Sequence, residues 1–527
     1  MSFGTRELEQ SVAAGAVEPH RVRIWARSAH AGPHTLRFEH DTGALVDEHA
    51  IMLDPSIADG TYADWFGGLS PSTRYRVQLR REDEVVSHAA FRTPPAGRDD
   101  APRRWSFGAV SCHQPFDDDG SLSDVSVSML RAARAALVRA DVAFVLMMGD
   151  QTYADSPASH SLFDDEYFRR IAPRGRTHPL QCTREELRAL YQARHRNFWG
   201  CEAFDRLVRQ FSCYCMPDDH ELVDNFGSDP SHAGEDWQAL RNGALDAFFD
   251  YQGSRVHPRD PATGDRPAAL DWGFRWGPAA VFGLDVRSNR RTEGERTTVF
   301  SEAQRASLQG FLHANVDAPL LVVMAPIPLV HVHEGVVAKI ARVLGHGSDL
   351  HERWAHPQCH DAREQFVSLL LAQAQAAPRQ RIVLLGGDVH AGAAFSIDFA
   401  DEGAQLLQFT SSALSNQQGW LAEVASGQSV HTAEAITLGD GRTGNVSLLR
   451  GRSREHDHNP YGGLNAGIVD VFDHGDWVGV GFRLIGHDGE GNPVTRFDTG
   501  EIGLRRDPDR RLSGMDELAD SLPPARR

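Results

Sequence analysis

The segment VAFVLMMGDQTYAD, residues 142–155, joins an unbroken apolar run to a polar turn. Residues 142–149 are apolar or glycine at every position, so neither face of the chain is polar there. Such a run predicts a strand in a sheet that is covered on both faces, as in α/β proteins. Asp150 and Tyr153 follow at the carboxyl end of this strand, where open α/β sheets bind ligands. The segment therefore predicts an α/β fold with a functional site directly after the strand.

Strands and helices alternate on both sides of this segment. Upstream, FGAVSC (107–112) precedes a helical pattern over residues 123–140, which gives strand, helix and strand in order. Downstream, one helix begins at Ser301, which fits a capping box with Gln304, and another covers about 362–376. Further strands are predicted in AVFGLDVR (280–287), LLVVMAPIPLV (320–330) and RIVLLGGDVH (381–390). Late in the chain, AGIVDVF (466–472) and WVGVGFRL (477–484) flank DHGD and predict a hairpin that closes a second sheet.

The first part of the chain has a different pattern of apolar and polar residues. Tyr75, Val77 and Leu79 alternate with polar residues, a period of two that predicts half-buried strands. The stretch GLSPSTRYRVQL (68–79) resembles the closing strands of immunoglobulin-like and fibronectin-type sandwiches. We therefore expect an all-β sandwich domain over 1–98, a linker over 99–104 and an α/β domain over 105–504. A charged tail over 505–527 is expected to be disordered.

The amino-acid composition disfavours some classes of binding partner. The 54 Lys and Arg against 72 Asp and Glu give the 527-residue chain a net charge of -18, which disfavours nucleic acids and anionic membranes. No apolar run reaches membrane-spanning length, and the first 15 residues, MSFGTRELEQSVAAG, show no signal peptide or twin arginine, so a cytoplasmic protein without a membrane span is expected. The six cysteines lack CxxC spacing, which argues for mostly free thiols rather than a disulfide scaffold or zinc ribbon.

Several apolar strands end in ionisable or hydroxyl residues. Taken singly, such an aspartate is explained by a turn or a helix cap, and Cys112 or His390 by packing or hydrogen bonding. Together with the acidic segment MPDDHELVDNFG (216–227), however, these endings predict one shared site. The residues that end the strands are Cys112 and His113, Asp150 and Tyr153, Asp285 and Arg287, and Asp388 and His390.

The mixture of ligand types points to a metal cluster. Carboxylate, amide and phenolate oxygens suit hard cations, whereas imidazole and thiolate suit transition metals. Two or more neighbouring cations are suited to phosphoryl transfer, because they clamp the ester oxygens and lower the pKa of a bridging water. Asp150 is the candidate that bridges two ions.

The motifs resemble those of the alkaline phosphatase D family of metallophosphatases and occur in that family's order. They are SC (111–112), GDQTYAD (149–155), DDHELVDN (218–225), LDVRSNR (284–290) and GGDVH (386–390). The resemblance implies a metallophosphoesterase-like two-sheet α/β core, preceded by the immunoglobulin-like or fibronectin-like sandwich. It also implies Fe(3+) with Ca(2+) beside it, and other divalent metals stay open.

The resemblance also implies roles for particular residues. It makes Asp219 and His220 candidate catalytic residues, although they stay open as ligands, as residues that support ligands or, for Asp219, as a helix cap. Arg287 and Arg290 are expected to grip phosphate oxygens, with a salt bridge from Arg287 to Asp285 as the alternative. The implied metal ligands are Cys112, Asp150, Tyr153, Asn225, Asp388 and His390.

The predicted function is a metal-dependent phosphoesterase that acts on small-molecule phosphate esters, either monoesters or diesters. The expected nucleophile is a metal-bound hydroxide or oxide. A phospholipase-D-like phosphodiesterase and a non-catalytic protein that binds metal or a phosphorylated ligand are the alternatives. The loops 156–183 and 425–465 are long enough to act as lids, or they are plain surface insertions.

Overall fold

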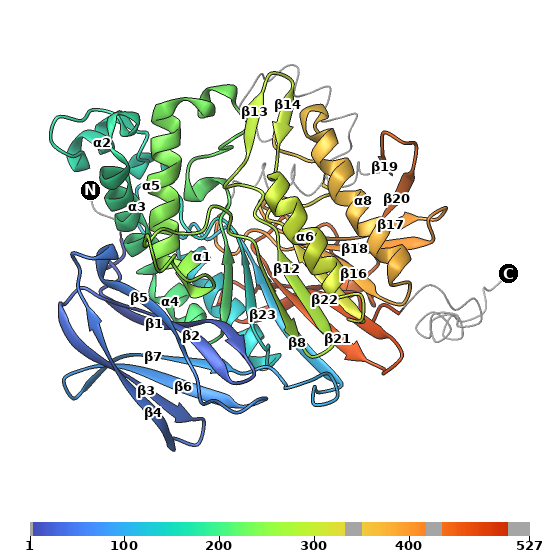
Figure 1. The fold of residues 1–527 in the computed structure, drawn as a ribbon, viewed down its shortest axis with the longest axis horizontal. Helices are drawn as coiled ribbons and strands as arrows, with labels where there is room; N and C mark the ends of the chain where they lie inside the picture. Colours follow the sequence, from blue (N-terminus) through green and yellow to red (C-terminus); the bar gives the residue numbers. More distant parts are fainter. Residues whose placement is uncertain (1–3, 332–349, 418–434, 504–527) are drawn as a thin grey trace.

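The computed structural model describes residues 4–331, 350–417 and 435–503, and Figure 1 shows their arrangement. The expected tail over 505–527 and the stretch 425–434 of the second long loop lie outside these residues. All six cysteines lie inside them, and each is buried and free of disulfides, as predicted.

The first seven strands form two antiparallel sheets, drawn in blue in Figure 1, and confirm the predicted sandwich. Tyr75, Val77 and Leu79 are buried while the residues between them are not, which is the alternation expected for one covered face. The three-stranded sheet has the order β1 (Gln10–Glu18), β2 (Arg21–Ser28) and β5 (Thr61–Phe66). The four-stranded sheet has the order β4 (Leu45–Leu53), β3 (Gly32–His40), β6 (Arg74–Arg81) and β7 (Glu84–Arg92).

The α/β part begins with a six-stranded sheet. Its strands in spatial order are β10 (Cys213–Met216), β9 (Val145–Met148), β8 (Arg104–Val110), β21 (Ala466–Asp473), β22 (Val478–His487) and β23 (Pro493–Asp498). The first three strands are parallel, and β21 and β22 form the predicted hairpin. The expectation that this hairpin closes a second sheet is wrong, because β21 pairs with the edge of β8 that β9 leaves open.

The other sheet has eight strands, and its centre, β12, β15, β16 and β18, is parallel. In spatial order the strands are β11 (Trp272–Trp276), β12 (Ala279–Gly283), β15 (Leu320–Met324), β16 (Arg381–Gly386), β18 (Ala404–Thr410), β17 (Ala393–Phe399), β20 (Thr443–Leu448) and β19 (Ala435–Thr437). A separate two-stranded ribbon joins β13 (Arg291–Glu293) to β14 (Arg296–Thr298).

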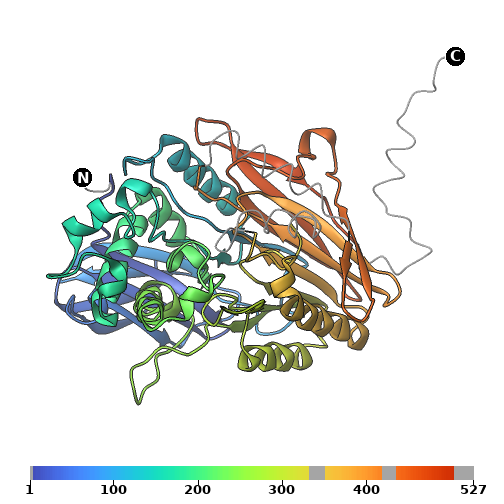
Figure 2. The same cartoon turned by 90° about the horizontal axis from the view of Figure 1, so that it is seen from above.

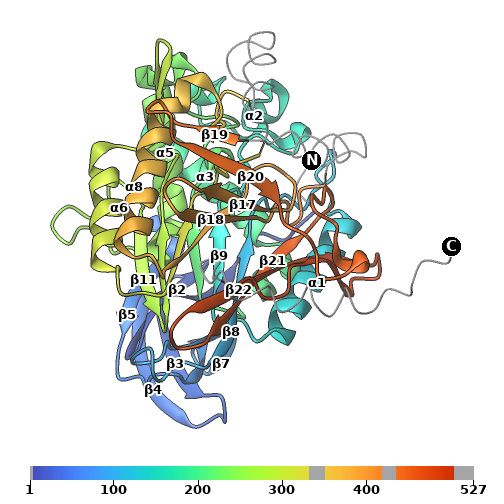
Figure 3. The same ribbon diagram turned by 90° about the vertical axis from the view of Figure 1, so that its right-hand side faces the viewer.

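The two large sheets pack face to face, with helices on their outer sides (Figures 2 and 3). The rings of Phe409 and Phe482 stack between the sheets with centroids 4.6 Å apart. Helices α6 (Glu302–Ala314) and α8 (His360–Ala376) cover the eight-stranded sheet. The side of the six-stranded sheet carries α1 (Asp124–Arg139), α3 (Arg184–Trp199), α4 (Glu202–Val208) and α5 (Glu235–Tyr251), with the short α2 (Asp165–Ile171) beyond them. This two-sheet core is the predicted fold class.

The predicted helix starts agree with the structure. Helix α1 occupies the expected range, and α8 begins two residues before the predicted start. At α6, the Ser301 hydroxyl accepts the Gln304 backbone N–H at 3.3 Å, and the Gln304 side chain accepts the Ser301 N–H at 2.8 Å. The capping box read from the sequence therefore forms.

The sandwich joins the α/β part through buried contacts. Trp25 of β2 is completely buried, and its indole N–H donates to the Asp250 carbonyl at 2.7 Å. The guanidinium carbon of Arg255 lies 4.5 Å from the Trp25 ring centroid and 4.4 Å from that of Trp199. The predicted linker, 99–104, leads from β7 into β8. The buried contacts of Trp25 set where the sandwich sits against the helices.

Candidate metal centre

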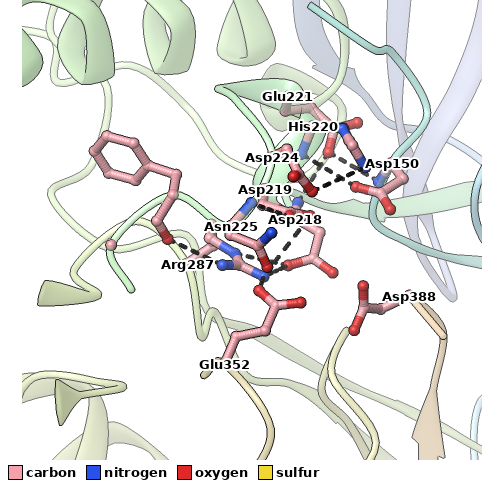
Figure 4. A network of polar contacts seen from close by, with 12 residues as sticks. Asp150, Asp218, Asp219, His220, Glu221, Asp224, Asn225, Arg287, Glu352 and Asp388 are labelled. Atoms are coloured by element: carbon pink, nitrogen blue, oxygen red, sulfur yellow. Dashed lines mark hydrogen bonds and ion pairs between the residues drawn. The ribbon is translucent and has the colours of Figure 1, made fainter. Parts of the chain in front are cut away.

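The loops that follow β8, β9, β10, β12 and β16 carry the predicted site residues. The carboxyl ends of neighbouring parallel strands lie at one edge of a sheet, so these loops meet where the two sheets pack together. Figure 4 shows side chains from four of these loops around one space.

On one side of this space a thiol, a phenol and a carboxylate converge. The Cys112 Sγ lies 3.4 Å from Asp150 Oδ2, and the Tyr153 hydroxyl lies 3.5 Å from the same oxygen. Ser412 Oγ is 3.0 Å from the Cys112 sulfur, and the Asn416 amide donates to the Tyr153 hydroxyl at 3.1 Å. The structure thus brings together three predicted ligands that come from two separate loops.

On the other side the carboxylates gather. Asp150, Asp218, Asp219 and Asp388 are all buried, and each offers an oxygen within 4.8 Å of the others. A second group with the same spacing is formed by Asp150, Asp219 and His220. Asp150 belongs to both groups and also faces Cys112, so it occupies the central position expected of a bridging ligand.

The electrostatics of this cluster fit a bound cation. Burial and the neighbouring Asp219 raise the pKa of Asp150 well above its usual range, and burial does the same to Asp218 despite the nearby Arg287. Among the described residues, Asp218 Oδ2 and Asp219 Oδ1 are buried and accept no hydrogen bond. Buried carboxylates are normally paired or coordinate a metal, so these oxygens suit a hard cation.

The thiol and the phenol fit a metal for a related reason. Burial raises the pKa of Cys112 and of Tyr153 well above their usual values, and the Asp150 charge adds to both shifts. Neither group would ionise at neutral pH on its own. A metal ion reverses this preference, because a coordinating thiol is deprotonated outright.

Backbone strain is concentrated in the same loops. Ten non-glycine residues of the described chain have positive φ, and five of the ten are predicted metal ligands. These five are Cys112, Asp150, Asn225, Asp388 and His390, with φ between 50° and 60°. Such conformations cost free energy and cluster at functional sites, where the surrounding structure enforces them.

Glu221, which has no predicted role, ties two of the loops together. Its carboxylate accepts the backbone N–H groups of Asp150 at 2.9 Å, Gln151 at 2.6 Å and Asp218 at 2.9 Å. It ends the short 3-10 helix η4 (Asp219–Glu221), which presents Asp219 and His220. The acidic segment is therefore both a helical turn and part of the centre, but the alternative of Asp219 as helix cap is wrong, because Asp218 occupies the N-cap position.

His220 lies beside the carboxylate cluster. Its Nδ1 is 2.8 Å from Asp155 Oδ1, and its ring stacks on Tyr153 with centroids 4.1 Å apart. Burial lowers the pKa of His220, but Asp155, Asp219 and Asp150 outweigh it and raise that pKa well above the usual value. Burial likewise raises the pKa of Asp219, but Arg287 and His220 prevail and lower it to about 2. The charges of Asp219 and His220 therefore stabilise each other.

Arg287 lies between the carboxylates of Asp218 and Glu352 (Figure 4). It is fully buried, and its guanidinium donates to Asp218 Oδ1 at 2.8 Å, to Glu352 Oε2 at 2.8 Å and to the Phe226 carbonyl at 2.9 Å. The alternative salt bridge to Asp285 is wrong, because the Arg287 guanidinium pairs with Asp218 and Glu352, whereas Asp285 Oδ1 accepts the backbone N–H groups of Arg287 at 3.0 Å and Ser288 at 2.8 Å.

The remaining predicted residues lie close by. Arg290 donates to the Glu352 carbonyl at 2.9 Å and to Ser228 Oγ at 3.3 Å. The Asn225 backbone N–H donates to Asp219 Oδ2 at 2.6 Å, and that of His390 donates to Ser412 Oγ at 3.0 Å.

Several partners in the centre were not predicted. Ser412 and Asn416 follow β18, and the strand-end signal that revealed Asp150 applies to FTSSALSN (409–416) as well. Glu352 pairs with Arg287, and Arg353 pairs with Asp388. Their segment has neither an apolar run nor a motif, so no sequence signal marks it.

Comparisons with known proteins agree with this architecture. The solved "Structure of PhoD" is similar with a TM-score of 0.64 and 16% identity, covering 98% of this chain and 94% of that one, which supports the fold. A beta-glucuronidase from Ruminococcus gnavus reaches a TM-score of only 0.26 at 10% identity, covering 72% of this chain and 53% of its own. No curated protein matches the sequence. In the described part of the chain, no helix is long and apolar enough to cross a membrane. The family model "PhoD-like phosphatase" matches residues 107–442, more than half of the sequence, and the chain belongs to this family.

Proposed function

We propose that the protein is a metal-dependent phosphoesterase. The observation that carries the proposal is the convergence of three other buried carboxylates, a thiol and a phenol on Asp150. A charge cluster of this kind needs cations, and neighbouring cations suit phosphate-ester hydrolysis. Membership in a phosphatase family agrees with the same chemistry.

The ligand types divide the centre into two sites. Cys112, Tyr153 and Asp150 would hold the transition-metal ion, for which the family resemblance implies Fe(3+). Asp150, Asn225, Asp388 and His390 would complete the sites, with Ca(2+) implied for the set rich in oxygen. Cations bound there would polarise the phosphoryl oxygens and make a strong nucleophile available at neutral pH.

The chain's own residues supply position and protons. Asp219 stays ionised and suits a ligand or an orienting group better than an acid. We assign His220, whose ring lies 2.8 Å from Asp155 Oδ1 and whose backbone N–H donates to Asp150 Oδ1 at 3.3 Å, as the acid that protonates the departing alkoxide. Arg287 holds the neighbouring carboxylates of Asp218 and Glu352 in place, whereas Arg290 donates to the Glu352 carbonyl and to Ser228. Phosphate binding by these two arginines stays a prediction.

The thiolate ligand makes a testable prediction about colour. If Cys112 and Tyr153 bind Fe(3+), charge transfer from both ligands should colour the purified protein, whereas zinc with its filled d shell gives no such band. We expect Cys112→Ser to shift or bleach the visible absorption and to lower turnover. Cys213→Ser and Cys215→Ser are matched controls, because both thiols are buried in β10, where Cys213 contacts the Val208 and Phe211 carbonyls and Cys215 contacts Met147.

A colourless, iron-free and active protein would refute the thiolate and phenolate ligation. Cys112 would then be a core residue, and its replacement by alanine would cost only about 1 kcal/mol of stability. The phosphoesterase assignment would stand in that case, because it rests on the carboxylates.

Turnover of p-nitrophenyl phosphate and bis(p-nitrophenyl) phosphate by the metal-loaded protein tests the function itself. Faster hydrolysis of the first compound identifies a monoesterase, and faster hydrolysis of the second identifies a phosphodiesterase. Full metal content without turnover of either compound would support a non-catalytic binding protein instead.

A further inference from the structure

A cavity of about 210 Å³ lies beside the metal centre. Two of its lining residues, His390 and Asn416, also border the centre. Asn416 donates to the Tyr153 hydroxyl at 3.1 Å, and its backbone N–H donates to the Cys112 carbonyl at 3.2 Å. A group in this cavity would therefore lie next to the proposed ligands.

The far wall of the cavity is a built structure. Tyr461 and Gly392 exchange two backbone hydrogen bonds, of 2.7 and 2.8 Å, which fasten Tyr461 to the loop that carries His390. Asn465 donates to the Ala413 carbonyl at 2.8 Å through its backbone and to the Gly463 carbonyl at 2.9 Å through its side chain. The wall is thus fastened to both loops of the centre, as expected of a preformed binding site.

The charge of the lining is opposite to that of the centre. In the described part of the chain, the residues that line the cavity include no Asp or Glu, and one of them is Arg496. The Arg496 guanidinium carbon lies 5.8 Å from the Tyr461 ring centroid, and its Nη2 donates to the His487 carbonyl at 2.8 Å. Its Nε is buried and makes no hydrogen bond within the described residues, none of which forms an ion pair with it.

The other lining groups are neutral or polar. Burial and Arg496 lower the pKa of His487, so its imidazole adds no charge at neutral pH. Asn416, Gln417 and Tyr461 offer amide and hydroxyl groups, which suit the hydroxyls of a polar alcohol. One guanidinium without an acidic partner matches a single negative charge, and its planar donors fit a carboxylate.

We propose that this cavity receives the alcohol side of the phosphate ester and that Arg496 recognises a carboxylate on that alcohol. The inference rests on the proposed function and adds a substrate class to it, namely phosphate esters of hydroxy acids. The phosphoryl group lies at the metal centre, and the carbon chain extends past Asn416 to Arg496.

Two matched pairs of esters test the proposal. The short pair is 3-phosphoglycerate and glycerol 3-phosphate, and the long pair is 6-phosphogluconate and glucitol 6-phosphate. In each pair the main change is a carboxylate in place of a hydroxymethyl group. For at least one pair, we expect kcat/KM to favour the carboxylate by roughly 10- to 100-fold, the range of a charge-assisted hydrogen bond. Arg496→Gln should bring that ratio close to one, and Arg496→Lys should keep part of it.

Arg305→Gln is the control, because Arg305 pairs with Glu302 on α6 and does not line the cavity. This variant should keep the wild-type ratio. Ratios near one for both wild-type pairs, or a ratio that folded Arg496→Gln retains, would overturn the proposal and leave the phosphoesterase assignment intact.

Binding separates the two claims if no ester is hydrolysed. The proposed function then fails, and calorimetric titration with the same pairs decides about the cavity. Tighter binding of the carboxylate ester that Arg496→Gln abolishes supports the proposal, whereas equal affinities within both pairs refute it.

Discussion

Asp150→Asn is expected to remove bound metal and turnover together. Asp150 faces Cys112 and Tyr153 on one side and the carboxylates of Asp219 and Asp388 on the other. An amide keeps the size of the side chain but has no negative charge, so it cannot bridge two cations well. We expect kcat to fall by about 10³-fold or more, since a lost metal clamp removes several kcal/mol of transition-state stabilisation.

Metal content and single-substrate kinetics, measured on one preparation, check this result. Asp470→Asn is the matched control, because Asp470 is also a buried aspartate but pairs with Arg483 in the six-stranded sheet. That variant should keep its metal. Normal metal content in Asp150→Asn with more than about a tenth of wild-type activity would contradict the bridging role.

Arg287→Gln should cause the largest loss of stability among the variants considered. Arg287 is completely buried and lies between Asp218 and Glu352, at 2.7 and 2.8 Å. Its removal leaves two buried carboxylates without their cation, a change that typically costs about 3–5 kcal/mol of unfolding free energy. Urea unfolding of the metal-free protein measures the effect without compensation from bound ions.

The control for this variant is Arg296→Gln, which breaks the exposed pair with Asp361. A pair open to solvent is worth about 0–1 kcal/mol, so this loss should be clearly smaller. Equal losses of unfolding free energy in the two variants would show that the buried ion pairs of Arg287 stabilise the protein no more than an exposed pair does.

Much of the fold was predictable from local patterns. The strands β9, β12, β15 and β16 are short apolar runs, and a period of two marks β6, so the chain reports burial directly. The place of β21 was not predictable in this way. β21 pairs with the edge of β8, which joins residues more than 350 positions apart in the sequence. No local sequence pattern encodes such a partner.

The same contrast between local patterns and long-range contacts holds for the residues of the site. Asp150 and Asp388 were found because each follows an apolar strand, and the acidic segment because its polar residues are so closely spaced. The partners of Arg287 were missed, because Asp218 and Glu352 are 69 and 65 residues away and meet it only through folding. Positive φ at five ligand positions also leaves no mark in the sequence, since none of the five is a glycine.

Elemental analysis of protein purified without chelators, combined with turnover of one monoester and one diester, tests the central claim most directly. For a metal-dependent phosphoesterase we expect more than one metal ion per chain. We also expect hydrolysis that a chelator abolishes and added metal restores. A metal-free protein that hydrolyses either ester at a rate unaffected by chelator would contradict the central claim.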